Sequence, residues 1–327
     1  MRPTSKKSCA TLAVLSLALA SCSGASSTSS APEADGSSTP LASSTTTTEP
    51  SATTTTNDVP VSGSSSGPIN VTESGTVIEN VHFTGNGDEN CVTITAASDV
   101  TVRNSRFTDC YKGVYAVNSS NVVVTDNVFE ANMPGRGRNA VQFDKVSGGH
   151  VARNSSIVGN GATQVEDHIS IYQSNGTSSS PIIVESNELS GGGPSTSGSG
   201  IMLGDNGGSW QVARQNVLRD PGQVGIGASG GSHITVTDNT VSSSSHSWSN
   251  VGIYAWDWKG AGCSDVTIAH NRVEWTDASG AAKPFWDGGN CSNLTVSDNS
   301  WQTTGGEPST GSGSRELHWV DSSCRQL

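Results

Sequence analysis

One ten-residue pattern recurs along the chain and constrains its fold more than any other feature. It reads SHITVTDNTV from Ser232, SDVTVRNSRF from Ser98, SNVVVTDNVF from Ser120, SDVTIAHNRV from Ser264 and SNLTVSDNSW from Ser292. Each copy alternates β-branched and polar residues, continues with Asp or Asn, and closes on one apolar residue. This order is typical of a short strand followed by a bend. The chain is therefore built from an internal repeat.

The spacing of the repeats predicts a coil whose loops differ in length. The closing apolar residues lie 22 to 32 residues apart, at Phe83, Phe107, Phe129, Ile157, Leu189, Leu218, Val241, Val273 and Trp301. A second short strand, such as CVTI from Cys91 or GIYA from Gly252, separates successive copies. Two or three short strands in each turn, without a helical pattern between them, predict an all-β parallel β-helix of about nine coils. An antiparallel sandwich of short strands is the alternative.

Stacked coils, about 4.8 Å apart, would bring equivalent residues of successive repeats into ladders. The aliphatic residue at the centre of each second strand, from Val92 to Ile253, is expected to point inward. Asn at the bend could hydrogen-bond to its copy on the next coil, it could merely tolerate a left-handed turn, or both could hold together. The Asn residues concerned are Asn127, Asn187, Asn216, Asn239, Asn271 and Asn299.

The first 67 residues are expected to lie outside the folded domain. Residues 1–21 have a basic start and a short apolar run, which indicates a secretory signal rather than a membrane span. Leu19 to Cys22 match the lipobox of bacterial lipoproteins, and this resemblance implies lipid attachment to Cys22. Residues 22–67 are rich in Ser and Thr and predict a disordered tether. We therefore expect an exported protein, anchored to the bacterial cell envelope by lipid only.

The remaining chain divides into a β-helix domain at 68–304 and a tail or cap at 305–327. Without its signal, the chain keeps 14 of its 17 basic residues and all 29 acidic ones. This acidity argues against nucleic acid as a partner. We expect a monomer.

The cysteines test the predicted register. Cys263 and Cys291 each lie ten residues before the closing apolar residue of their repeat, so they would stack on adjacent coils within disulfide reach. Cys91 and Cys110 are a second candidate pair, and Cys324 has no assigned partner. Export to an oxidising compartment would favour both disulfides.

The repeated VTVxxNxF-like strand, the GIYA-like second strand and the irregular coil length resemble the right-handed parallel β-helix of the pectin-lyase-like superfamily. The resemblance covers about Val71 to Trp301. It implies the fold, but the superfamily includes polysaccharide lyases, glycoside hydrolases, uronate epimerases and non-catalytic surface proteins. The paired-Asp signature of polygalacturonase-like hydrolases and a lyase Arg motif are both missing from the sequence.

A candidate catalytic cluster follows from the residues expected on the outer face of the second strands. Asp144 and His168 would occupy outward positions on consecutive coils, whereas strict alternation would turn Asp167 inward. The full set of candidate catalytic residues is Asp144, His168, Tyr172, Asp167, Asp205 and Lys145, with Glu166 beside them. Candidate substrate-binding residues are Arg136, Arg138, Gln142, Tyr254, Trp256 and Trp286.

Two chemistries are open for this cluster. In a lyase or epimerase, His168, Tyr172 or Lys145 would remove a proton beside a uronate carboxylate, and Arg136, Arg138 or Ca²⁺ held by Asp144, Asp167 and Asp205 would neutralise the developing charge. In a hydrolase, Asp144 and either Asp167 or Asp205 would form the acid and base pair. The basic residues near the cluster favour the lyase, acting on a uronate-containing polysaccharide. A non-catalytic surface module that binds glycans is the third possibility.

Overall fold

The computed structural model describes residues 63–131, 139–159 and 165–302, which contain 28 strands in three parallel sheets and no helix. Sheet A consists of β1 (Ser64–Ser66), β4 (Val81–Thr84), β7 (Arg106–Thr108), β10 (Val128–Ala131), β13 (Ser155–Val158), β16 (Glu188–Ser190), β19 (Val217–Arg219), β22 (Thr240–Ser243), β25 (Arg272–Trp275) and β28 (Ser300–Gln302). Sheet B consists of β2 (Ile69–Val71), β5 (Val92–Thr95), β8 (Lys112–Val117), β11 (Asn139–Asp144), β14 (Asp167–Tyr172), β17 (Ser199–Asp205), β20 (Val224–Ala228), β23 (Val251–Trp256) and β26 (Phe285–Gly289). Sheet C consists of β3 (Val77–Glu79), β6 (Thr101–Arg103), β9 (Ser120–Thr125), β12 (Ser147–Ala152), β15 (Ile182–Glu185), β18 (Ser209–Arg214), β21 (Gly231–Thr237), β24 (Cys263–Ala269) and β27 (Thr295–Ser297).

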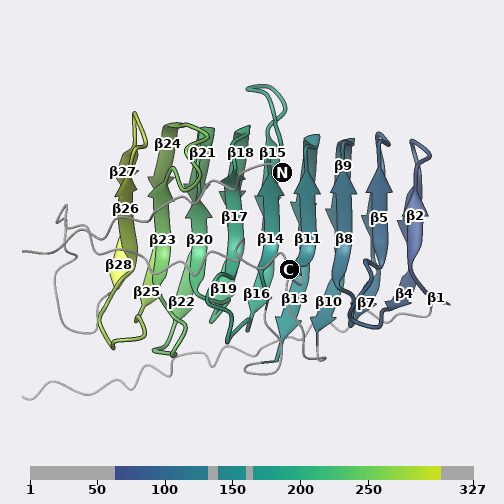
Figure 1. Ribbon diagram of the computed structural model, residues 1–327, viewed down its shortest axis with the longest axis horizontal. Helices are drawn as coiled ribbons and strands as arrows, with labels where there is room; N and C mark the ends of the chain where they lie inside the picture. Colours follow the sequence, from purple (N-terminus) through teal and green to yellow (C-terminus); the bar gives the residue numbers. More distant parts are fainter. Residues whose placement is uncertain (1–62, 132–138, 160–164, 303–327) are drawn as a thin grey trace, which may run out of the picture. The chain divides into compact units, whose positions relative to one another are not determined.

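Every coil contributes one strand to each sheet, and each strand pairs in parallel with its equivalent on the next coil (Figure 1). For example, β8, β11 and β14 are neighbours in sheet B, and they belong to three successive coils. The predicted right-handed parallel β-helix is therefore confirmed. No helix among the described residues has the length and apolarity to cross a membrane.

The core is a set of ladders inside the coils. Phe83, Phe107 and Phe129 of sheet A stack with ring centroids 5.0 and 4.6 Å apart. The aliphatic ladder of sheet B, from Val92 to Ile253, is buried as predicted. The prediction that Ile157 closes the fourth repeat is wrong, because Ser156 pairs with Phe129 while Ile157 is 48% exposed. Ser156 is therefore a small polar residue in a ladder of large apolar ones.

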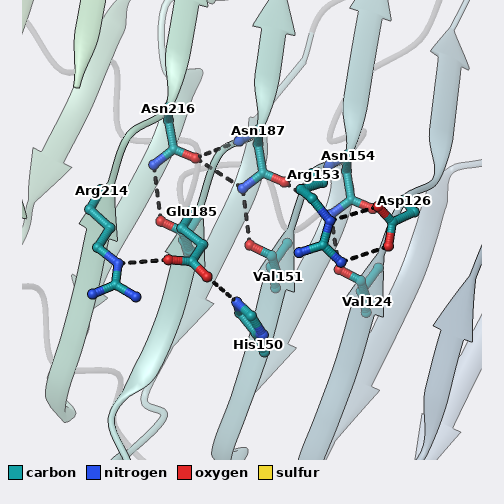
Figure 2. A network of polar contacts seen from close by, with 11 residues as sticks. Val124, Asp126, His150, Val151, Arg153, Asn154, Glu185, Asn187, Arg214 and Asn216 are labelled. Atoms are coloured by element: carbon teal, nitrogen blue, oxygen red, sulfur yellow. Dashed lines mark hydrogen bonds and ion pairs between the residues drawn. The ribbon is translucent and has the colours of Figure 1, made fainter. Parts of the chain in front are cut away.

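The buried Asn ladder joins successive coils at the bend between sheets C and A (Figure 2). Asn187 donates from its backbone N–H and its Nδ2 to Asn216 Oδ1, at 3.0 and 2.9 Å, and from Nδ2 to the Val151 carbonyl, at 3.0 Å. Asn154 belongs to the same ladder, although the sequence analysis omitted it. The hydrogen-bonded ladder is confirmed and satisfies backbone groups that the bend would otherwise leave unpaired.

The left-handed turn belongs to the residue before each ladder Asn. Asp126 has a φ of 59°, Ser186 of 54° and Asp238 of 57°. The ladder Asn residues are not in this conformation, so tolerance of a positive φ does not explain them. Their buried hydrogen bonds explain them instead.

Ion pairs follow the same one-coil spacing on the outside of this bend (Figure 2). Glu185 accepts hydrogen bonds from Arg214 Nε at 2.6 Å and His150 Nε2 at 2.8 Å. Arg153 Nε donates to Asp126 Oδ1 at 2.7 Å. These contacts lie at the surface, so each contributes about 1 kcal/mol or less to stability.

Both predicted disulfides are confirmed. Cys263 and Cys291 have Cα atoms 4.5 Å apart, and those of Cys91 and Cys110 are 5.5 Å apart. The first pair links β24 to the segment before β27, which lies on the next coil. The predicted signal, Cys22, the tether up to residue 62, the whole tail at 305–327 and Cys324 lie outside the described residues.

The Asn ladder gives a direct test of what holds the coils in register. Replacing Asn187 with Ala would leave the Val151 carbonyl and the Asn154 N–H without their buried partners. We expect a loss of about 2–4 kcal/mol in the free energy of unfolding, measured by urea denaturation. Asn70→Ala, at an exposed position of β2, should change stability by no more than about 0.5 kcal/mol. Equal effects of the two changes would contradict the structural role of the ladder.

Candidate functional site

Three polar side chains form a column on the outer face of sheet B. Asp144 at the end of β11 pairs in register with Tyr172 of β14, which in turn pairs with Asp205 of β17. Because adjacent strands lie about 4.8 Å apart, the two carboxylates are separated by two strand spacings with Tyr172 between them. The column is central to the site.

A β-bulge brings Asp205 into this column. The register of β14 and β17 shifts between Ser170 and Tyr172, so that Asp205 rather than Gly204 lies opposite Tyr172. Gly204 has a φ of +63°, and a Cβ there would come within 2.0 Å of the Gly230 carbonyl oxygen. The position therefore requires glycine, and the extra residue changes which side chain faces outward.

Asp144 is partly shielded from solvent and contacts both Tyr115 and Lys145. Tyr115 OH donates a hydrogen bond to Asp144 Oδ2 at 3.0 Å, and Lys145 Nζ lies 3.4 Å from Oδ1. Among the described residues, Oδ1 has no hydrogen-bond partner although it is buried. Burial and the bond to Asp144 raise the pKa of Tyr115 to about 12, so Tyr115 stays a donor at neutral pH. The Asp144 carboxylate is thus held in place by Tyr115 on one oxygen and by Lys145 on the other.

Asp205 and Tyr172 share a lysine. Lys259 Nζ lies 3.2 Å from Asp205 Oδ1 and 5.3 Å from the centroid of the Tyr172 ring. Asn206 Nδ2 donates to Tyr172 OH at 2.8 Å, which fixes the phenol. Burial raises the pKa of Asp205, and Lys259 opposes this effect. The carboxyl of Asp205 therefore holds its proton more tightly than an exposed Asp does.

The start of β14 departs from strict alternation and exchanges the predicted orientations of Asp167 and His168. His168 Nδ1 lies 2.7 Å from the hydroxyl of Ser156, a member of the inner ladder of sheet A. Asp167 instead lies in the same strand position as Val224, which packs with Met202 in an apolar cluster separate from the main core. The prediction that His168 points outward is therefore wrong, because the bend rotates the first residues of the strand.

His168 fills the space that the small Ser156 leaves inside the coil. Its Nε2 donates to the Gly191 carbonyl at 2.7 Å, which leaves Nδ1 to accept from Ser156. Other coils have a small residue at this strand position. Gly113 is one of them, and a Cβ there would come within 2.4 Å of the Phe129 ring. Burial lowers the pKa of His168 to about 4, so the ring is neutral at physiological pH. His168 is a packing residue without access to a substrate.

Asp167, at the opposite end of β14 from Tyr172, is almost fully buried. Its Oδ1 accepts hydrogen bonds from the Ser199 hydroxyl at 2.5 Å and from the Ser199 N–H at 3.2 Å. Burial, followed by the charge of Glu166, raises the pKa of Asp167 well above its usual range. The neighbouring Glu166 accepts from Ser197 Oγ at 3.0 Å. A carboxyl in this environment favours its protonated form.

Lys112 and Tyr115 extend the site toward the preceding coil. Lys112 Nζ lies 4.4 Å above the Tyr115 ring and donates to Gln142 Oε1. Burial lowers the pKa of Lys112, while Asp144 acts in the opposite direction. Gln142, a predicted substrate-binding residue, therefore accepts a hydrogen bond from a lysine. Strict alternation does not place Lys112 on the outer face, because its outward direction depends on the same bend that rotates Asp167.

Aromatic residues gather on the same face farther along sheet B. The Trp256 ring lies 5.4 Å from the Trp286 ring and 4.8 Å from that of Trp258. Tyr254 is fully buried beneath this group, where its OH lies 3.2 Å from Met202 Sδ. The structure thus brings Trp256 and Trp286 together as expected, but Tyr254 supports them from below.

Arg136 and Arg138 lie outside the described residues. The carboxylates proposed as Ca²⁺ ligands do not form a suitable group, since Asp167 is bonded to Ser199 and Asp205 to Lys259. Within the described ranges, no three His, Cys, Asp or Glu side chains are arranged to hold a metal ion. Lys259, which the sequence analysis missed, lies in the loop after β23 and gives no periodic signal.

The buried carboxyl of Asp167 predicts a specific pH dependence of stability. A folded-state pKa raised above the unfolded value stabilises the fold at low pH, and this contribution is lost as pH rises through the folded pKa. Asp167→Asn should therefore be more stable than the wild type at pH 8, with a smaller difference at pH 4. Urea denaturation at both values measures this. Asp88→Asn, at an exposed position, serves as the control, and an advantage of Asp167→Asn that grows toward pH 4 would contradict the assignment.

Comparisons with known proteins agree with the fold. A family model described as "Right handed beta helix region" matches residues 41–177, whereas no curated protein matches the chain. A hyperthermoactive exopolygalacturonase from Thermotoga maritima is similar in structure, with a TM-score of 0.41, 11% identity, and coverage of 69% of this chain and 71% of the other.

Two further solved structures are similar over a comparable share of this chain. The periplasmic alginate epimerase AlgG has a TM-score of 0.44 and 15% identity, with coverage of 70% of this chain and 61% of the epimerase. The catalytic domain of a GH87 alpha-1,3-glucanase in complex with nigerose has a TM-score of 0.36 and 11% identity, with coverage of 71% and 53%. This chain therefore spans less than two thirds of either protein, and the likeness concerns the fold alone. By its own strand pairing and by the family model, the chain is a right-handed parallel β-helix.

Proposed function

We propose that the chain is a carbohydrate-active protein that hydrolyses a polysaccharide on the outer face of sheet B. The observation that carries the proposal is the column of Asp144, Tyr172 and Asp205 on three successive strands. Two carboxyl groups that flank a surface on which a sugar can lie are the minimum requirement for acid and base catalysis of glycoside hydrolysis.

The spacing of the carboxyl groups favours inversion of configuration. Two strand spacings amount to about 9.6 Å between the backbones of Asp144 and Asp205. Inverting glycosidases have carboxyl groups about 6.5–9.5 Å apart, which leaves room for the attacking water, whereas retaining enzymes need about 5–5.5 Å. Side chains that lean toward one another across Tyr172 would lie within the inverting range.

The environments of the two groups suggest their roles. Asp205 has a raised pKa and is the candidate general acid, which would protonate the oxygen of the departing sugar. Asp144, which Tyr115 and Lys145 hold in place, is the candidate base, which would accept a proton from water. Tyr172 lies between them, and its ring provides a flat face for the sugar. Trp256 and Trp286 would bind sugar units farther along the face.

Lyase-like elimination at a uronate is the second candidate, and Lys112 favours it. Burial lowers the pKa of this lysine and so increases the fraction of neutral amine that could remove a proton. Two of the three lysines on this face are paired with carboxyl groups, Lys145 with Asp144 at 3.4 Å and Lys259 with Asp205 at 3.2 Å, which leaves little positive charge to attract a polyanionic substrate and argues against the lyase. The buried His168 does not enter either mechanism.

Incubation with a panel of neutral and uronate polysaccharides tests the proposal. We expect chain shortening with new reducing ends, and a rate lowered about 10²–10⁴-fold by Asp144→Asn or Asp205→Asn. Asp238→Asn, on the bend between sheets C and A, is the matched control and should cleave at the wild-type rate. Products that absorb ultraviolet light through a new double bond would support elimination instead. If the Asp144→Asn and Asp205→Asn proteins both still shorten the polymer, this column is not the catalytic site. If the wild type shortens no polymer of the panel, a non-catalytic binding module is favoured.

We also propose that the protein is held on the outside of the cell envelope by a lipid on Cys22. The lipobox match at Leu19 to Cys22 and the Ser/Thr-rich segment that follows support this proposal. Cys22→Ala should move most of the protein from the membrane fraction to the medium, which immunoblotting of both fractions measures. An unchanged distribution would exclude Cys22 as the anchor.

A further inference from the structure

The outer face of sheet C contains a hollow of about 530 Å³ on a different sheet from the proposed catalytic column. Its floor is a column of hydroxyl groups, because Thr235, Thr267 and Thr295 pair in register on three successive strands. Ser178 and Pro181 form part of its wall. They belong to the loop between β14 and β15, which turns back at Thr177 to Ser180 and projects beyond the neighbouring coils (Figure 1).

The rim of the hollow is a second column that lies two residues before the floor. Trp210 and His233 stack there, with ring centroids 3.9 Å apart and planes inclined by 18°. On the next two coils, Asn293 Nδ2 donates to Asp265 Oδ1 at 3.0 Å. An aromatic surface at one end thus continues into hydrogen-bonding groups at the other.

Trp210 is held in a costly backbone conformation at this rim. Its φ is +52°, in the left-handed region that Gly, Asn and Asp adopt readily and bulky residues avoid. Other coils have suitable residues in the same kind of turn, such as Asn121 with a φ of 49° and Asp265 with 55°. A tryptophan there is destabilising compared with Asn. Stability of the fold therefore does not account for the indole ring, and a binding function would.

We propose that this hollow binds an uncharged glycan, as a second site that does not take part in cleavage. An indole ring packs on the apolar face of a sugar, and threonine hydroxyls, the Asn293 amide and the Asp265 carboxylate suit sugar hydroxyls. Of the described residues that line the hollow, none is Lys or Arg, so a polyanionic chain would meet Asp265 without a compensating cation.

The dimensions agree with this ligand. The rim and floor run over four coils, which corresponds to about 14 Å along the β-helix. The volume lies within the range of about 300–1,000 Å³ typical of ligand sites. A polymer segment could therefore lie across the strands, with one sugar on Trp210 and the next ones over the threonines. The site would hold the polysaccharide on sheet C, independently of any chemistry on sheet B.

Affinity electrophoresis of the complete oxidised protein tests the proposal. The gels would contain a β-glucan, a galactomannan or an arabinoxylan, with polygalacturonate as the charged comparison. We expect at least one uncharged polymer to retard the protein. Trp210→Asn should weaken this retention about tenfold or more, because it removes the central ring. It should not lower the melting temperature, since Asn adopts the required φ more readily than Trp.

A pair of threonine variants separates the hollow from the rest of sheet C. Thr267→Val removes a floor hydroxyl and should weaken retention a few-fold, whereas Thr101→Val, in the same column outside the hollow, should leave it unchanged.

Two further variants distinguish failure of this site from failure of the catalytic one. Trp210→Asn should still cleave short oligosaccharides at the wild-type rate. Asp144→Asn should still be retained by the polymer.

Three results would overturn the proposal. The first is full retention of Trp210→Asn on the polymer that retards the wild type. The second is a lower melting temperature of that variant together with the loss of retention, which would make the ring structural. The third is retention of the wild type by polygalacturonate only, or by none of the polymers, which would leave a protein partner as the occupant of the hollow.

Discussion

In-register parallel stacking of the coils is the constraint on which the rest of the structure depends. Each strand bonds only to its equivalents on the neighbouring coils, so a side chain repeated at one position is also repeated in space about every 4.8 Å. The buried Asn ladder strengthens this register where strands alone would not, because each Asn satisfies backbone groups at the bend and its own copy on the next coil. Loops can then vary in length without changing the ladders.

The same spacing sets the chemistry that the outer faces can perform. On sheet B it places Asp144 and Asp205 two strand spacings apart with Tyr172 between them. On sheet C it produces a column of threonine hydroxyls beside Trp210. Both proposed sites lie where the repeat is interrupted, by the bulge at Gly204 and by a tryptophan, Trp210, in a turn that other coils form with Asn or Asp. We infer that the regular ladders give a rigid support and that the irregular residues give the specificity.

The fold could be predicted from sequence because its pattern repeats. A residue type that recurs at one position of the repeat indicates the same place in each of the coils. The Cys263–Cys291 disulfide follows from the same argument. The site could be predicted only in part. Asp144 and Tyr172 lie in the regular part of their strands, so alternation places them correctly. His168 and Asp167 lie at the strand start, where the bend rotates the chain, and a two-residue period does not encode that rotation. Lys259 comes from a loop, for which the repeat provides no position.

The central claim is that the Asp144, Tyr172 and Asp205 column holds the bond to be cleaved. The most direct measurement is a crystal structure of the Asp144→Asn protein soaked with oligosaccharides from the polymer that the wild type shortens. We expect a sugar chain on the outer face of sheet B, with a ring over Tyr172 and a glycosidic oxygen within hydrogen-bond distance of Asp205. A chain bound only elsewhere, or a cleaved bond remote from Asp205, would contradict it.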